Sequence, residues 1–132
     1  MAKEFSVVDA WVGRFTAEST LSAYLAETYP DDDEESPISM LAADMGQWYY
    51  DHDFLEHSFH QTPSSDLESR LMPHSFSRSF MASAIAAFEA LSSPPFNVIL
   101  LACGPTIESP VSIVREQYRL WYLGRFSCGP DA

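Results

Sequence analysis

The two ends of the chain carry hydrophobic patterns that predict β-strands. Residues 5–15 are rich in valine and aromatic side chains at both odd and even positions, as expected of a strand that is covered on both faces. The apolar run within residues 97–103 lies between Pro95 and Gly104, which is typical of a central buried strand. Residues 111–126 combine β-branched and aromatic side chains with interspersed charges, and we expect one or two further strands there.

Helical patterns fill the middle of the chain. Apolar side chains at helical spacing predict a helix over 16–28, which Pro30 ends. A short helix is expected over 37–46 and a single helical turn over 66–71. The clearest helix covers 77–91, where apolar residues repeat along one face. This apolar stripe consists of Phe80, Met81, Ala84, Ile85, Phe88 and Leu91.

The order of these elements predicts the fold class. Strands at both ends and helices between them indicate an α+β domain over residues 1–132, with a small, mainly antiparallel sheet and about three helices packed on one face. The sequence AWVGRF at 10–15 is echoed by WYLGRF at 121–126. We expect these two segments to form similar strand ends in one sheet.

Charge narrows the range of partners. Seven Lys and Arg residues stand against nineteen Asp and Glu residues, which gives a net charge of −12. Such a field repels nucleic acid and anionic membranes and attracts basic proteins or cations. We therefore expect neither nucleic acid nor a membrane as a partner. The longest apolar run, VILLAC at 98–103, is too short to span a bilayer, and we find no export signal, so we predict a cytoplasmic protein.

The segment YYDHDFLEHSFH at 49–60 holds acids and histidines among aromatic side chains. Its periodicity fits a strand and a helix equally well. A helix would place acids and histidines on one face as potential zinc ligands, and the alternative function is therefore a metal-dependent hydrolase using His52, Glu56, His57 and His60. However, the spacing has one residue too many for an H-x-x-E-H motif. The primary interpretation therefore assigns no catalytic residue, metal or cofactor.

The favoured interpretation is an interaction surface formed by two stretches, residues 31–35 and 46–57. Aromatic side chains bury large areas at low entropic cost, while carboxylates steer a basic partner and pair with its Arg and Lys side chains. The competing interpretation is that the aromatic residues belong to the core and the acids are merely solvated. The residues assigned to partner binding are Asp31, Asp32, Asp33, Glu34, Glu35, Asp51, Asp53 and Glu56, with Trp48, Tyr49 and Tyr50 as aromatic anchors.

Several short motifs together resemble a known family. They are the strand with Trp11 and Gly13, the helix with Tyr24, the segment 51–59, the helix 77–91 and the apolar strand 98–102. Their order is similar to that of the immunity protein 22 family of bacterial polymorphic toxin systems, over most of the chain and least clearly beyond residue 105.

The resemblance implies an α+β, non-enzymatic protein that inhibits a toxin by binding it directly. It implies as partner a cognate toxin encoded by a neighbouring gene, with a basic nuclease as one class of target. A homodimer that buries the same aromatic side chains stays open.

Overall fold

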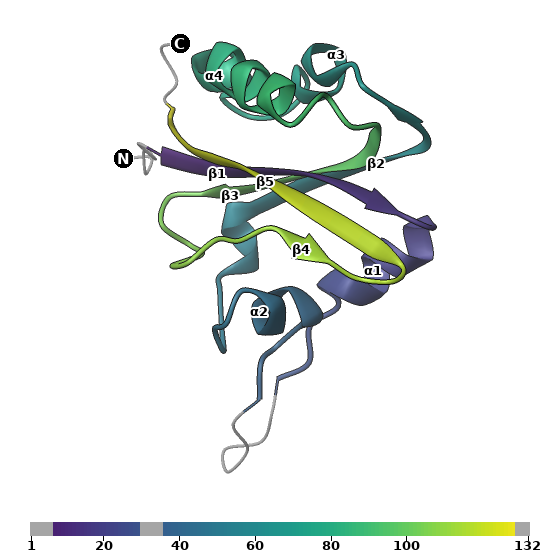
Figure 1. The fold of residues 1–132 in the computed structure, drawn as a ribbon. Coiled ribbons are helices and arrows are strands. Elements are labelled where there is room, and N and C mark those ends of the chain that lie inside the picture. The colour runs from purple at the N-terminus through teal and green to yellow at the C-terminus, as the bar shows by residue number, and fades with distance from the viewer. Residues whose placement is uncertain (1–6, 30–35, 129–132) are drawn as a thin grey trace.

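A computed structural model describes residues 7–29 and 36–128, and its centre is a single antiparallel sheet (Figure 1). The sheet has the strand order β2-β3-β1-β5-β4, and every neighbouring pair is antiparallel. Its strands are β1 (Val7–Phe15), β2 (Leu55–Ser64), β3 (Phe96–Cys103), β4 (Ile113–Val114) and β5 (Tyr118–Ser127).

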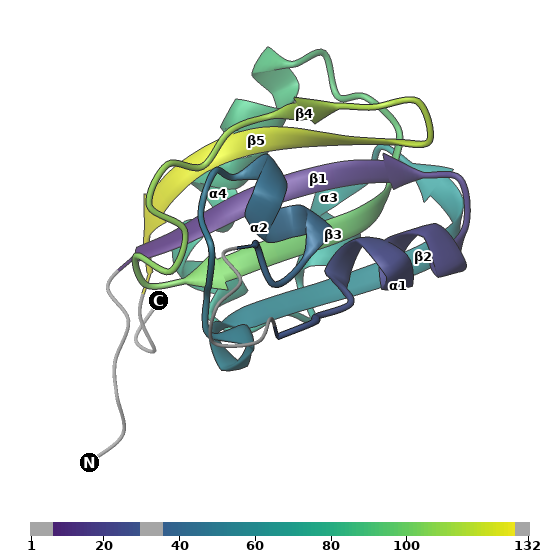
Figure 2. The same cartoon turned by 90° about the horizontal axis from the view of Figure 1, so that it is seen from below.

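Helices cover both faces of this sheet. On one face, α1 (Glu18–Leu25) and α2 (Met40–Asp44) pack on the core side chains of β1 and β3, and Figure 2 shows both helices lying across that face. On the other face, α3 (Leu67–Leu71) and α4 (Ser77–Ala90) enclose a second apolar cluster. A 3₁₀ turn, η1 (His52–Phe54), precedes β2.

Alternating side chains of the central strands explain the two clusters. In β1, Trp11 and Phe15 point toward α1 and α2, whereas Val8 and Val12 point toward α3 and α4. All eight residues of β3 are buried. A strand that is apolar at both parities loses hydrophobic stabilisation unless both of its faces are covered.

The structure confirms the predicted α+β class with an antiparallel sheet. The expected placement of about three helices on one face is wrong, because the two-sided apolar pattern of β1 and β3 requires cover on both faces. The helix predicted over 77–91 is found as α4 and the turn predicted over 66–71 as α3. The helix predicted over 37–46 begins later, since Ser39 caps it by accepting a 3.0 Å hydrogen bond from the Ala42 amide.

The two echoed hexamers pair with each other directly. Trp11 lies opposite Tyr122 and Val12 lies opposite Trp121, and the register shifts next to Ala10. Gly124 lies at this irregularity with φ at 142°, a conformation that strongly favours glycine. Gly13 leaves room for the side chain of Leu120 on the neighbouring strand, because a Cβ at position 13 would lie 2.9 Å from Leu120 Cδ2.

One charge is fully buried in the sheet. The Asp9 carboxylate accepts hydrogen bonds from Arg125 Nε at 3.0 Å and Nη2 at 2.9 Å, and from the Tyr122 hydroxyl at 2.6 Å. Arg125 Nη2 also donates to the carbonyl of Ile107. The Asp9–Arg125 ion pair therefore holds the loop between β3 and β4 against the sheet.

Within residues 7–29 and 36–128, no helix has the length and apolar content required to cross a bilayer.

Candidate partner-binding surface

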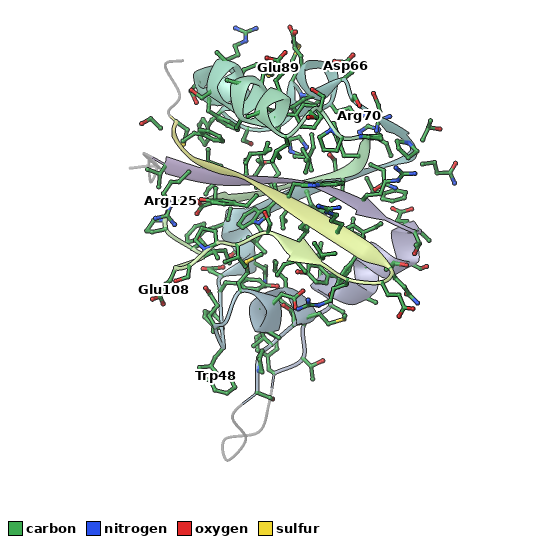
Figure 3. The ribbon with its side chains drawn as sticks, viewed as in Figure 1. Trp48, Asp66, Arg70, Glu89, Glu108 and Arg125 are labelled. Atoms are coloured by element: carbon green, nitrogen blue, oxygen red, sulfur yellow. The ribbon has the colours of Figure 1, made fainter. Side chains whose placement is uncertain are left out.

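The end of the molecule farthest from α3 and α4 is built from three chain segments. The Thr28 amide donates to the Ile38 carbonyl at 2.7 Å, and the Ile38 amide donates to the Trp48 carbonyl at 3.0 Å. These bonds join the segment that leaves α1, the segment that enters α2 and the segment that leaves α2. We call the exposed surface here the tip surface, and Figure 3 shows Trp48 projecting outward from it. Its residues are Tyr29, Trp48, Tyr49, Asp51, His52 and Asp53.

Gln47 braces the tip surface against the loop between β3 and β4. Its side-chain amide donates to the carbonyls of Tyr49 at 2.8 Å and Thr106 at 3.1 Å, and its oxygen accepts from the Glu108 amide at 3.1 Å. That loop is itself held to the sheet by Arg125. The backbone that carries the aromatic side chains is thus fixed before any partner arrives, which lowers the entropic cost of binding.

Three aromatic side chains on this surface are more than half exposed. The exposed fractions are 55% for Trp48, 60% for Tyr49 and 58% for Tyr29. Large exposed aromatic groups that cluster together are typical of interaction sites, whereas scattered ones carry little meaning. Sequence reasoning selected Trp48 and Tyr49 but missed Tyr29, because it extended the first helix to residue 28. The structure ends α1 at Leu25.

Tyr50 is not part of this surface, which corrects its assignment as an anchor. Only 2% of the residue is exposed, and its hydroxyl shares a 2.7 Å hydrogen bond with Ser39 Oγ inside the cluster under α1 and α2. Burial raises the pKa of its hydroxyl, and the bond to Ser39 offsets part of that rise. Tyr50 therefore anchors the segment from the inside.

Charged side chains lie next to Tyr29 and along η1. Glu27 accepts hydrogen bonds from the Tyr29 hydroxyl and lies 3.1 Å from His52 Nδ1. The Glu27 carboxylate raises the pKa of Tyr29 to about 12 and also raises the pKa of His52. Asp51 accepts from the Asp53 amide and so caps η1, while the Asp53 side chain extends into solvent.

Glu56 lies elsewhere, which is a second correction. Glu56 is the second residue of β2 and points toward the connection between α3 and α4. Its carboxylate lies 2.5 Å from His74 Nδ1 and accepts from the Ser75 amide at 3.0 Å. Burial alone would raise its pKa, but these hydrogen bonds outweigh burial and lower the pKa. Its role in the structure is to hold β2 to that connection.

A family model described as Immunity protein 22 matches residues 8–128. The chain belongs to the Immunity protein 22 family. The match includes β4 and β5, although the sequence motifs resembled the family least beyond residue 105. Comparisons with curated proteins and with solved structures find no match.

In this Immunity protein 22 chain, the negative charge is concentrated along the sequence. No Lys or Arg occurs between Arg14 and Arg70, a stretch that contains thirteen Asp and Glu residues. The tip surface belongs to this stretch. The predicted acidic residues Asp31, Asp32, Asp33, Glu34 and Glu35 also belong to it, and they lie outside the described residues.

The structure does not bring the four residues of the alternative hydrolase together. His52 lies on η1, and the other three lie on β2, where alternation puts His57 on the opposite face from Glu56 and His60. Among the described residues, no group of three His, Cys, Asp or Glu side chains is placed to hold a metal ion. The helical phase that suggested a zinc site is therefore wrong for 55–60.

A serine, a histidine and a glutamate form a chain of hydrogen bonds on the α3 and α4 side of β2. Ser58 Oγ lies 2.8 Å from His74 Nε2, and His74 Nδ1 contacts Glu56. This is the connectivity of a hydrolytic triad. His74 is buried, however, and none of the three residues lines either of the two pockets described in this structure. In this Immunity protein 22 chain these hydrogen bonds join the edge strand β2 to the connection between α3 and α4.

Proposed function

We propose that this protein is an immunity protein that neutralises a cognate toxin, encoded by a neighbouring gene, by binding the toxin through the tip surface. Membership of the Immunity protein 22 family supports the immunity role. The observation that carries the choice of surface is the three exposed aromatic side chains, two of them on the backbone that Gln47 braces. The carboxylates of Glu27, Asp51 and Asp53 belong to the same end of the molecule.

The chemistry of the tip surface favours a basic partner. Trp48 and Tyr49 provide rigid apolar area that can be buried in a pocket of the partner. Asp53 provides a charge that attracts and pairs with Arg and Lys, and the acidic residues 31–35 add five more carboxylates to the same stretch of sequence. A toxin that cleaves nucleic acid has a basic cleft for phosphates, and carboxylates can occupy that cleft in their place. We therefore favour a basic nuclease as the toxin class, and inhibition by occlusion without catalysis.

The first experiment tests the aromatic anchors. The protein is co-expressed with the product of the adjacent gene, and the affinity of the purified complex is measured for wild type, Trp48→Ala and Met72→Ala. Met72 is a matched control because it is also 55% exposed but lies beyond α3, away from the tip surface. Trp48→Ala should weaken binding by roughly 30-fold, about 2 kcal/mol, as removal of a hot-spot tryptophan does. Equal affinities for the two variants would show that the tip surface is not part of the interface.

A second experiment tests the electrostatic part. Asp53→Lys and Glu89→Lys change the net charge equally, but Asp53 lies on the tip surface and Glu89 lies at the end of α4 on the opposite side (Figure 3). Only Asp53→Lys should slow association strongly at low salt, and the difference between the variants should shrink as ionic strength rises. A similar loss for both variants would mean that overall charge, and not this surface, guides the toxin.

A further inference from the structure

Two arginines lie on neighbouring strands at the end of the sheet opposite Val7 and Ser127. Arg14 on β1 is the cross-strand partner of Arg119 on β5. Both side chains point to the face that carries α3 and α4, because Val12 and Trp121, two residues along each strand, pack on that face. The turn between β4 and β5 lies beside this end of β1, because the Thr16 amide donates to the Gln117 carbonyl at 3.2 Å. Like charges directly opposite each other destabilise an antiparallel pair.

The charges of this pair are not neutralised within the described part of the chain. The ion pairs formed there by arginine use Arg115 and Arg125, and neither Arg14 nor Arg119 takes part. The Arg119 guanidinium instead lies over the Trp121 ring, 4.8 Å from its centre. The chain has only seven Lys and Arg residues, and two of them are direct cross-strand partners here.

The arginine pair lines an open pocket of about 530 Å³, a size typical of small-molecule sites. Gln61, Gln117 and Trp121 also line this pocket. Two other charged residues of the wall, Arg115 and Glu116, have opposite signs. Arg115 is already paired with Asp44 at 2.7 Å.

We propose that this pocket binds a small phosphorylated ligand whose phosphate bridges Arg14 and Arg119. Guanidinium groups form bidentate, charge-assisted hydrogen bonds with phosphate oxygens. A phosphate monoester carries close to two negative charges at neutral pH, and it can neutralise both arginines, whereas a carboxylate would neutralise only one. None of the residues of the tip surface lines this pocket.

The test is a comparison of thermal unfolding with and without inorganic phosphate, with ionic strength held constant by sodium chloride. The variants are Arg14→Gln and, as a matched control, Arg78→Gln on the exposed face of α4. Without phosphate, Arg14→Gln should be at least as stable as wild type, because the change removes a repulsion. With phosphate about tenfold above its dissociation constant, the midpoints of wild type and Arg78→Gln should rise by roughly 4–6 °C. The midpoint of Arg14→Gln should not move, so the order of stability reverses.

Adenosine monophosphate is used in a parallel titration. A larger rise of the unfolding midpoint with the nucleotide than with phosphate would show that the pocket also contacts the nucleoside. An equal rise would show that the pocket recognises only the phosphate group. Arg119→Gln repeats the test from the other strand, with circular dichroism to confirm its fold. The proposal is overturned if wild type does not respond to either ligand, or if Arg14→Gln and Arg119→Gln respond as wild type does.

Discussion

Replacement of Arg125 by methionine should destabilise the protein far more than a change at a partly exposed side chain normally does. The substitution keeps most of the aliphatic stem but removes two of the three hydrogen bonds to the buried Asp9 carboxylate. Removing one partner of a buried ion pair costs about 3–5 kcal/mol. The Arg125 side chain is 38% exposed, so water can replace part of the lost interaction. We therefore expect a loss at the lower end of that range, about 3 kcal/mol.

A double-mutant cycle separates the charge effect from lost packing. Asp9→Asn removes the negative charge but keeps a group of similar shape that can still bond the Tyr122 hydroxyl. In this background Arg125→Met should cost only about 1 kcal/mol, because no buried charge is left unpaired. The assay is equilibrium unfolding in urea, followed by tryptophan fluorescence and extrapolated to water. The reasoning is refuted if Arg125→Met costs the same in both backgrounds, or if it costs less than about 1 kcal/mol in the wild type.

Three further predictions concern the sheet, the fastening of β2 and the brace of the tip surface. Gly13→Ala should lower the free energy of unfolding by about 1–3 kcal/mol, because the new Cβ would lie 2.9 Å from Leu120 Cδ2 and 3.1 Å from the Arg119 carbonyl oxygen; urea unfolding that matches wild type would contradict this. Glu56 has a lowered pKa in the folded state, so its stabilising effect is complete above its ordinary value of 4.5 and disappears as pH falls through the lowered one. Wild type should therefore lose more stability than Glu56→Gln on acidification below that value, and parallel acid-unfolding curves would disprove the link. Gln47→Ala should speed amide exchange at Glu108 while leaving exchange in β3 unchanged, since only the former amide bonds to the Gln47 side chain; unchanged exchange at Glu108 would show that the brace is not needed.

Local patterns in the sequence were sufficient to predict most of the elements. Two-sided apolar composition identified β1 and β3 as covered strands, and the stripe from Phe80 to Leu91 identified α4. The same two-sided pattern also implied cover on both faces. The number of helices on each face could not be derived, because it depends on which strands become neighbours.

The candidate surface shows where local patterns stop being informative. Trp48, Tyr49 and Tyr50 are adjacent and chemically similar, yet only Tyr50 is buried, because its hydroxyl finds Ser39 at the start of α2. Glu56 was grouped with Asp53 by its position in the sequence. It points instead toward His74, eighteen residues later, a contact that no periodicity within the segment could reveal. Burial and pairing of these side chains are set by tertiary contacts.

The position of β1 in the sheet has a consequence for how the protein is made. β1 leaves the ribosome before every other strand, yet its two neighbours are β3 and β5. Gly13 can pair with its partner on β3 only after Val98 has been synthesised, and Val7 can pair with its partner on β5 only after Ser127 has been synthesised. Contacts this distant in sequence make folding slow. Between the synthesis of β1 and that of β5, the growing chain therefore carries an apolar strand without its neighbours, and the sheet is complete only after β5 has been inserted beside β1.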